Sequence, residues 1–385
     1  MKKACHEQNR RVFVAMSGGV DSSLAAALLK GHGYDVRGIF MRTWSPEGIH
    51  CTTRDDRFMA ARAAAHLGIP FAVWDFRDEY KNAVVDYMTA EYAVGRTPNP
   101  DVMCNSRIKF GVFLQKALEQ GADFIATGHY VKIKNKKSKI KMYELACARD
   151  LNKDQSYFLW TLTQDQLKHC LFPIGDYEKS QVRRMAQERG LPNWDKKDSQ
   201  GLCFVGAIDF ADFLRSIMPA REGAVLTTTG ATIGMHDGAQ FVTIGQRHGL
   251  NLGIKNHELA ISGNRETKAR YVVERDMATN TVVVAEENDP ALYRKEITVM
   301  DVNWISGETP QMPLSCFARI RFRQPLQEAR IMNGESWGDR EKSESIIHDS
   351  RFVIQFKNPQ RAVAPGQSAV CYAKNGAMLG GGVIA

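Results

Sequence analysis

The sequence predicts an α/β protein: a doubly wound parallel sheet, then a small central domain, then a C-terminal antiparallel β-barrel. Three observations support this. In the first half, short apolar runs alternate with segments of helical spacing, which is typical of a parallel sheet whose strands are joined by helices. From about Ala207, glycine-rich stretches with short strands take over. Beyond about Ala285 only apolar runs of period two remain, as in small barrels. The expected domains are 1–206, 207–285 and 286–385.

In the first domain, the apolar run Val12–Ala15 predicts the first strand, and the spacing of Val20, Leu24 and Leu28 predicts the helix that follows. Ligands of such sheets bind at the carboxyl ends of the strands. The next predicted elements are the strand 36–41, a helix around 57–67, the strand 71–74, a long helix at about 78–94, a helix near 108–119 and the strand 124–127.

The central region contains one predicted amphipathic helix, Ile208–Met218, among glycine-rich stretches with short strands. The barrel is predicted from segments in which apolar and polar residues alternate, separated by turn residues. These predicted strands are 297–302, 317–322, 352–356, 369–372 and 378–384.

The loop between the first strand and helix, Met16–Ser23, reads Met-Ser-Gly-Gly-Val-Asp-Ser-Ser. Gly18 and Gly19 allow close approach of the backbone to an anion, and a helix start aims N–H groups at it. We expect the hydroxyls of Ser17, Ser22 and Ser23 to add donors. The Gly-Lys-Ser/Thr ending of a Walker A loop is missing. The pattern instead resembles the pyrophosphate-binding loop of the N-type ATP pyrophosphatases, which split ATP between the α and β phosphates.

Composition indicates a soluble globular chain of 385 residues, with no apolar run of the ~20 residues that span a membrane. The segment before the first strand is short and lacks the apolar region of a secretion signal, so the expected compartment is the cytoplasm. A net charge of +8 favours a polyanionic partner. The basic run Lys132–Lys141 is either a solvated hairpin tip or a phosphate-contacting loop.

Eight cysteines are scattered without a Cys-x-x-Cys pair, so a structural zinc site finds no support and no metal-ligand set is predicted. Cys104 follows the rigid, proline-rich segment Thr97–Asp101 and precedes a predicted helix, whose N-terminus would stabilise its thiolate. Cys203 follows Lys196, Lys197 and Gly201, and nearby positive charge lowers a thiol pKa. Either cysteine could instead be a packed structural thiol.

Eight ordered motifs together resemble the bacterial tRNA 2-thiouridylases, which install sulfur at C2 of the wobble uridine, and mitochondrial relatives share the motifs. The resemblance spans nearly the whole chain. Its motifs are Met16–Ser23, Thr97–Asn105, Ala126–Tyr130, Lys153–Phe158, Asp198–Cys203, Gly245–Arg247, Arg321–Gln324 and Pro365–Gln367.

The resemblance implies a set of site residues and partners. Cys203 would carry a persulfide received from a sulfur-donor protein, either a cysteine desulfurase or a sulfur-relay protein, and Cys104 would release sulfur by forming a disulfide with Cys203. Asp101, with Asn99 and Pro100, would approach the flipped-out base. ATP and Mg²⁺ would bind at the loop Ala15, Met16, Ser17, Gly18, Gly19, Val20, Asp21 and Ser22, with Met41 and Gly128 on the adenine and ribose side. The implied tRNA contacts are His129, Lys153, Asp154, Gln155, Arg321, Phe322 and Gln367.

Three alternatives stay open at this stage. Another ATP pyrophosphatase, such as a tRNA lysidine synthetase or an amidotransferase-coupled synthetase, would need no matched cysteine pair. The same substrate could be thiolated through an iron–sulfur cluster held by Asp101, Cys104 and Cys203. The chain could also be a non-catalytic tRNA-binding protein with a relic nucleotide site.

Overall fold

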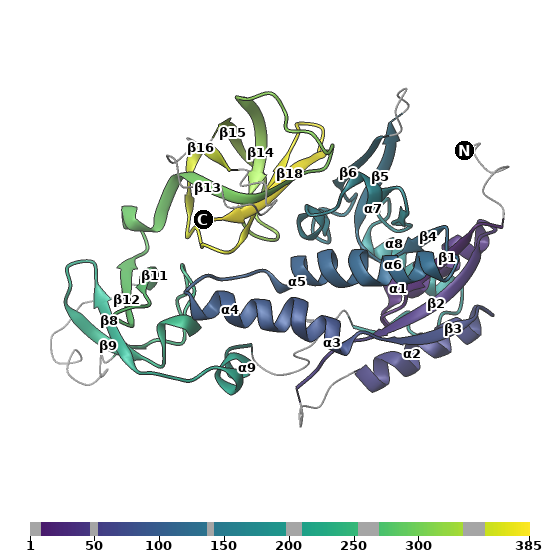
Figure 1. The fold of residues 1–385 in the computed structure, drawn as a ribbon, viewed down its shortest axis with the longest axis horizontal. Coiled ribbons are helices and arrows are strands. Elements are labelled where there is room, and N and C mark those ends of the chain that lie inside the picture. Colours follow the sequence, from purple (N-terminus) through teal and green to yellow (C-terminus); the bar gives the residue numbers. More distant parts are fainter. Residues whose placement is uncertain (1–8, 47–52, 137–141, 198–209, 253–268, 334–350) are drawn as a thin grey trace, which may run out of the picture.

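The computed structural model describes residues 9–46, 53–136, 142–197, 210–252, 269–333 and 351–385. Its first domain is built on a five-stranded sheet of order β3-β2-β1-β4-β7, in which all neighbours are parallel (Figure 1). The predicted parallel sheet is confirmed. Of its five strands only β7 was not predicted, because two residues are too few to show a periodicity. The strands are β1 (Arg11–Ala15), β2 (Asp35–Arg42), β3 (Phe71–Asp75), β4 (Phe124–Ala126) and β7 (Cys170–Leu171).

Side chains of β1 alternate between two layers of helices, as a doubly wound sheet requires. Val12 and Val14 pack with residues of α1 and α2 on one face of the sheet. Phe13 and Ala15 face the main core, which contains residues of α6. The helices of these layers are α1 (Val20–Gly31), α2 (Thr53–His66) and α6 (Phe113–Glu119), and α8 (Lys179–Glu188) packs against α1.

Two long helical segments run side by side between the sheet and the other domains (Figure 1). The first comprises α3 (Arg77–Tyr80), π-helical turns at Lys81–Asp86 and α4 (Tyr87–Ala93). The second begins with α5 (Pro100–Met103), continues as π-helix over Cys104–Val112 and ends in α6. It starts eight residues before the predicted Ile108, because Asn99 caps it and Pro100 occupies the first helical position.

A β-hairpin projects from the first domain, formed by β5 (Val131–Lys136) and β6 (Met142–Cys147) (Figure 1). The basic run 132–141 therefore lies on a hairpin, and its tip, 137–141, is outside the described residues. The short helix α7 (Gln164–Leu167) follows and is held by a capping box between Thr163 and Gln166.

The central domain is a five-stranded sheet of order β10-β9-β8-β12-β11 with one helix, α9 (Phe210–Ile217). Phe213, Leu214 and Met218 pack into the core formed by α3 and α4, which joins this domain to the first. The strands are β8 (Gly223–Thr227), β9 (Thr232–His236), β10 (Asn251–Leu252), β11 (Arg270–Asp276) and β12 (Thr281–Glu286).

The C-terminal domain is a closed antiparallel barrel of order β13-β16-β15-β14-β17-β18, which confirms the predicted fold class. Five of its strands overlap the predicted ones. β15 was not predicted because its sequence, QEARIMN, has weak apolar alternation and only Ile331 is fully buried. The strands are β13 (Tyr293–Trp304), β14 (Leu314–Arg319), β15 (Gln327–Asn333), β16 (Phe352–Arg361), β17 (Ser368–Tyr372) and β18 (Met378–Ile384).

The barrel and the first domain share a buried interface. The Tyr157 hydroxyl donates to the carbonyl of Ser368 at 2.9 Å, and the Trp160 indole donates to the Ser368 hydroxyl at 3.0 Å. Arg319 of β14 pairs with Asp154 at 3.3 Å, with the Asp154 side chain fully buried. This buried ion pair thus joins β14 of the barrel to the first domain. In the part of the chain that the structure describes, no helix is long and apolar enough to cross a membrane.

Candidate nucleotide and base site

The loop between β1 and α1 turns sharply at Gly18, whose φ is +78°. A Cβ at this position would lie 2.2 Å from the backbone oxygen of Asp56, at the start of α2. Only glycine fits both the positive φ and this close approach. The first turn of α2 therefore packs directly on the loop, and the predicted approach of Gly18 to a phosphate stays a prediction.

Two of the three loop serines are used inside the protein. The Ser22 hydroxyl accepts from the Ser17 backbone N–H at 3.2 Å and donates to the Gly19 carbonyl at 3.2 Å. The buried Ser23 hydroxyl accepts from the side-chain amide of Asn193 at 3.0 Å, and the same amide donates to the Gly18 carbonyl at 2.9 Å. These bonds hold the loop itself, and the expected contact of either hydroxyl with an anion stays a prediction. The Ser17 side chain is exposed.

The apolar residues of the loop belong to the core. Ala15, Met16 and Val20 are buried, and the Met16 N–H donates to the Ile39 carbonyl at 2.8 Å, continuing the ladder between β1 and β2. Any nucleotide contact by these three residues would come from the backbone. Met41 lies near the carboxyl end of β2, half-buried between two core clusters.

Asp21 forms an ion pair that the sequence did not reveal. Its two carboxylate oxygens accept from the Lys179 ammonium, each at 2.8 Å, and one also accepts from the Tyr130 hydroxyl at 2.8 Å. Lys179 begins α8 and is largely buried, while Asp21 keeps 30% of its side-chain surface exposed. The pair thus brings a cation to the edge of the loop, where a phosphate would need one.

Gly128 packs against the other side of the loop. A Cβ at Gly128 would lie 2.6 Å from the backbone nitrogen of Ser22 and 2.8 Å from the carbonyl carbon of Asp21. The segment after β4 can approach the start of α1 this closely only because residue 128 has no side chain. The sequence placed both segments at strand ends, and the structure brings them into contact.

The segment 97–105 is held by all three domains. The Thr97 N–H donates to the Pro365 carbonyl at 2.7 Å, and the Gln367 amide donates to the carbonyls of Thr97 and Pro98 at 2.9 and 3.2 Å. Arg275 of the central domain donates to the Thr97 hydroxyl at 2.9 Å. The side-chain nitrogen of Gln367 thus positions this loop, and its predicted contact with tRNA stays a prediction.

Asp101 lies in the first turn of α5, after Asn99, whose side chain caps the helix by accepting from the Val102 N–H at 3.3 Å, and the buried Pro100. Burial raises the pKa of the Asp101 carboxyl above its ordinary value, and the charge of Lys109 partly opposes this rise. Lys109 lies on the π-helical part of the same helix, two turns further on.

His129 is buried, in contrast to the predicted tRNA contact. Its Nδ1 lies 2.7 Å from the Thr127 hydroxyl, and its ring centroid lies 5.8 and 6.3 Å from those of Phe110 and Phe172. Burial holds the pKa of His129 well below its usual value, and Lys109 lowers it further. The imidazole is therefore neutral at pH 7. The charge of Lys109 thus lowers the pKa of both Asp101 and His129.

Cys104 is buried in the second turn of this helix, five residues after the cap at Asn99. Cys104 therefore lies within the helix, four residues after its first residue, and not before the helix as the predicted start at Ile108 implied; Asp101 lies one turn before it. Cys203 falls in 198–209, outside the described residues, so the predicted pair of thiols is not tested.

The residues of segment 153–155 are buried or half-buried and bond to neighbouring segments of the first domain and to the barrel. The Asp154 carboxylate is buried and accepts from the Ala148 N–H at 3.0 Å and the Ser156 hydroxyl at 2.9 Å, besides pairing with Arg319. Its expected contact with tRNA does not fit this burial. Gln155 accepts from the Tyr130 N–H at 3.0 Å, and Lys153 is half-buried beside it.

Arg321 and Phe322 lie at the junction of the barrel with the other domains. The Arg321 guanidinium donates to the carbonyls of Ile244, at 3.1 Å, and Ala362, and burial lowers its pKa. The Phe322 ring lies 4.4 Å from that of Phe158, centroid to centroid. Both predicted tRNA contacts are thus half-buried and already engaged within the protein.

Sequence reasoning missed the residues that connect the motifs. Lys109, Lys179 and Asn193 carry no local signal except their proximity to named motifs, and the contacts of Tyr130 and Lys196, which lie in segments that the sequence singled out, were not predicted. Among the described residues, no group of three or more His, Cys, Asp or Glu side chains could hold a metal ion. Asp21, the expected neighbour of magnesium, is paired with Lys179 instead.

Three family models match the chain in order. They are described as a tRNA methyl transferase HUP domain over residues 10–207, a tRNA methyl transferase PRC-barrel domain over 211–286 and an aminomethyltransferase β-barrel domain over 294–384.

Curated relatives match over nearly their full length, and each is named a tRNA-specific 2-thiouridylase MnmA. The protein from Geobacillus thermodenitrificans is 44% identical, covering 100% of this chain and 96% of the relative. That from Francisella philomiragia is 40% identical over 98% of this chain and 99% of the relative. That from Nitrosomonas eutropha is 44% identical, with coverage of 97% and 98%.

Proposed function

Since this chain belongs to the family of tRNA-specific 2-thiouridylases, we propose that it is a sulfurtransferase that replaces the C2 oxygen of the wobble uridine of tRNA with sulfur, using ATP. One observation carries the proposal beyond family membership. Residues 127–130 join the phosphate loop, through Gly128, to the helix of Asp101 and Cys104, through His129 and Lys109. A nucleotide and a base bound at these two places would be neighbours.

The first step is adenylation. The uridine O2 attacks the α-phosphorus of ATP, the bond to the β-phosphate breaks and pyrophosphate leaves with the electron pair. The base loses its N3 proton, and Asp101 is the residue proposed to accept it. A half-buried carboxylate with a raised pKa is suited to this, because a base works best with a pKa near the working pH. AMP then becomes the leaving group at C2.

ATP is proposed to bind at the phosphate loop, with Ala15 to Ser22 offering backbone N–H groups and with Met41 and Gly128 on the adenine and ribose side. Lys179 supports phosphate binding here, because its ammonium lies at the loop edge. Magnesium would accompany the ATP phosphates. The described residues present no carboxylate cluster for it, and Asp21 is paired with Lys179.

The second step is sulfur transfer. A persulfide on Cys203 attacks C2 through its outer sulfur, and AMP leaves with the electron pair of the C2–O bond. The Cys104 thiolate then attacks the inner sulfur of Cys203, which forms the Cys104–Cys203 disulfide and releases 2-thiouridine, whose N3 regains a proton. A thiol reductant must supply two electrons to reset the enzyme. The position of Cys104, one helical turn after Asp101 at the proposed base site, supports its assignment as the second thiol.

Contacts to tRNA are proposed for Asn99, Pro100 and Asp101 at the base, and for Lys153 and the basic hairpin β5–β6 around it. His129, Arg321, Phe322 and Gln367 are proposed to act mainly by holding the surfaces that tRNA contacts. The net charge of +8 supports a binding constant that falls steeply with salt. A cytoplasmic location and a separate sulfur-donor protein are part of the proposal.

Mass spectrometry of tRNA nucleosides tests the proposal. Wild-type protein with ATP, magnesium, tRNA and a sulfur donor is expected to form 2-thiouridine, and omission of ATP is expected to abolish it. Cys203→Ser should accept no labelled sulfur, while Cys104→Ser should accept label and keep it. Tightly bound label on Cys104, or full turnover by Cys104→Ser, would contradict the assigned roles.

Two alternatives have their own readouts. An iron–sulfur cluster on Asp101, Cys104 and Cys203 would give anaerobically purified protein a visible absorbance band that each cysteine variant loses. A non-catalytic tRNA-binding protein would show no tRNA-dependent exchange of labelled pyrophosphate into ATP. The proposed enzyme is expected to be colourless and to catalyse that exchange.

A further inference from the structure

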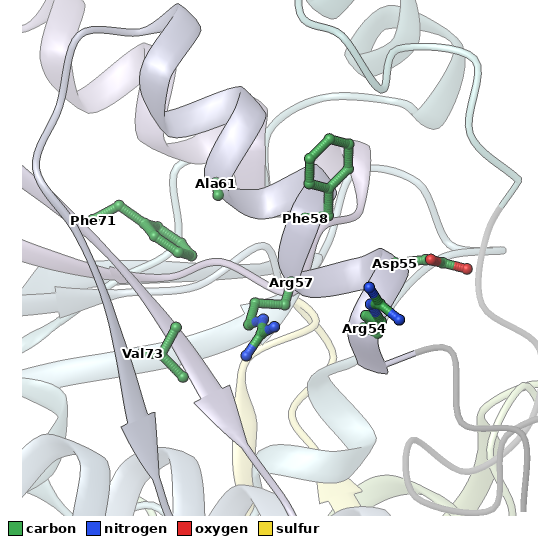
Figure 2. Close-up of a pocket in the computed structure, with 7 residues that line it drawn as sticks. All are labelled: Arg54, Asp55, Arg57, Phe58, Ala61, Phe71 and Val73. Carbon is green, nitrogen blue, oxygen red and sulfur yellow. The ribbon is translucent and has the colours of Figure 1, made fainter.

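One face of the first domain carries an open cavity of about 590 Å³ between α2 and β3, lined by Arg54, Asp55, Arg57, Phe58, Ala61, Phe71 and Val73 (Figure 2). These seven residues are called the α2–β3 face. We propose that it is the docking surface for the protein that delivers sulfur, an acidic partner that inserts an apolar side chain into the cavity. The proposal rests on the proposed function.

The apolar part of this face is exposed to solvent. Phe58 on α2 is 63% exposed and Val73 on β3 is 41% exposed, and Phe71 lies half-buried behind them. Single exposed apolar residues are common on any protein surface. Here two of them line one cavity from two different elements, as Figure 2 shows, so they form a single apolar site.

β3 also forms an edge of the parallel sheet. Among the described strands it pairs only with β2, which leaves its outer backbone edge open to a partner strand. The side chains of Phe71 and Val73 point to the cavity, whereas Trp74 turns to the core and packs on Phe13 and Phe113. An open edge beside an apolar cavity favours a protein partner over RNA, because RNA has no strand to add.

The charge of the face selects an acidic partner. Arg54 and Arg57 line the cavity, and the guanidinium of Arg62 lies 5.8 Å from the Phe58 ring centroid. Asp55 is the single carboxylate among the lining residues. Complementary charge across an interface speeds association and fixes its orientation.

The position of the face is suited to sulfur delivery. The first turn of α2 packs on the phosphate loop through Asp56 and Gly18, and the Asp56 carboxylate accepts from Lys196. Lys197 is the last described residue before the segment that contains Cys203, six positions further on. Six residues reach at most about 20 Å. Because Lys196 is tied to α2 through Asp56, a donor held on α2 and β3 would lie on the flank of the nucleotide site from which the segment with the acceptor thiol starts.

Two variants test the face while leaving the site residues intact. The first is Arg54→Glu with Arg57→Glu, and the second is Phe58→Ser. Arg184→Glu, an exposed charge reversal on α8, is the matched control. Melting curves of all three should match that of wild type, because the altered side chains are exposed. The probe is a bacterial cysteine desulfurase charged with ³⁵S-cysteine.

We expect label transfer to both face variants to fall by about tenfold or more, while Arg184→Glu stays at the wild-type rate. Exchange of pyrophosphate into ATP with tRNA, which needs no sulfur, should be unchanged in every variant, and so should the tRNA Kd. The docking proposal would be overturned if the face variants accepted label at the wild-type rate, or if the wild-type chain accepted none. A weakened tRNA Kd would instead assign the face to RNA. Absence of exchange in wild type would refute the proposed function itself.

Discussion

Lys109 acts electrostatically on two titratable groups of the base site, the half-buried Asp101 and the buried His129. It lies on the π-helical part of the helix that carries Asp101 and Cys104, and its charge acts on both Asp101 and His129. A π-helix completes a turn in more residues than an α-helix, and such turns are frequent at functional sites. Removing the charge of Lys109 is therefore the most direct test of how it affects the protonation of Asp101 and His129.

Replacing Lys109 by Met is expected to raise the pKa of Asp101 further, because burial already raises it and the opposing charge is lost. If Asp101 acts as a base, activity falls as the pH drops through the pKa of Asp101. A higher pKa therefore moves the acidic limb of the pH–activity profile to higher pH. The measurement is the pH profile of tRNA-dependent pyrophosphate release. Lys109→Arg should restore the limb, and Lys116→Met, a lysine that stacks on Trp74, should leave it in place. An unmoved limb in Lys109→Met would remove Asp101 as the base.

Asp21 and Lys179 form a partly buried pair, and Asp21→Asn leaves the ammonium without its counter-charge. We expect a loss of roughly 1–2 kcal/mol in the free energy of unfolding, moderated by the exposure of Asp21. The control is Glu328→Gln, which breaks an exposed pair with Lys357 and should cost at most about 0.5 kcal/mol. Urea denaturation compares the two. Equal losses would show that the Asp21 pair does not stabilise the loop. Pyrophosphate exchange should fall in Asp21→Asn alone.

At the scale of elements, the parts predicted well from sequence are those that a local pattern determines. The strand–loop–helix unit at Met16–Ser23 is an example, because glycine and apolar spacing are read within a few residues. The helix start at Pro100 was placed too late because two prolines and a polar segment read as a loop. The pair Asn99-Pro100 is nevertheless a helix-start signal, a capping residue followed by proline at the first helical position, and the contact of Asn99 with the Val102 N–H confirms that the helix starts there.

Gly18→Ala is expected to destabilise the loop, since a positive φ and a backbone contact at 2.2 Å both exclude a Cβ. Strain at such a position costs on the order of 1–3 kcal/mol. Gly31→Ala is the matched control, because a Cβ at the end of α1 meets nothing within 4 Å. It should be neutral or stabilising by up to about 1 kcal/mol. Thermal unfolding measures both, and a Gly18→Ala protein as stable as Gly31→Ala would refute this account.

At the scale of the molecule, the fold type of each of the three domains and their order along the chain could be predicted from the sequence. The contacts between the domains could not. Gln367 and Asp154 show the reason. Each lies in a motif that the sequence identified, and each was expected to contact tRNA. Their actual partners, Thr97 and Arg319, are far away in sequence, and no local pattern encodes such a pairing. The boundaries at 206 and 285 stay predictions.

The buried pair of Arg319 and Asp154 can be tested by a double-mutant cycle. Arg319→Met is expected to cost about 3–5 kcal/mol, because it leaves a buried carboxylate without its counter-charge. Adding Asp154→Asn should recover part of that loss. Chemical denaturation of the four proteins gives the coupling energy. If the two single losses simply add, the pair does not hold the barrel on the first domain.

The shared core also has a consequence for synthesis on the ribosome. Val370, Tyr372 and Met378 complete the same hydrophobic core as Phe13 of the first strand. A nascent chain folds its first domain early, yet that domain keeps an apolar surface uncovered until residues 370–378 leave the exit tunnel. Messages cut short just before residue 370 should therefore yield chains that chaperones retain and proteases remove, although both predicted catalytic cysteines in them have been translated.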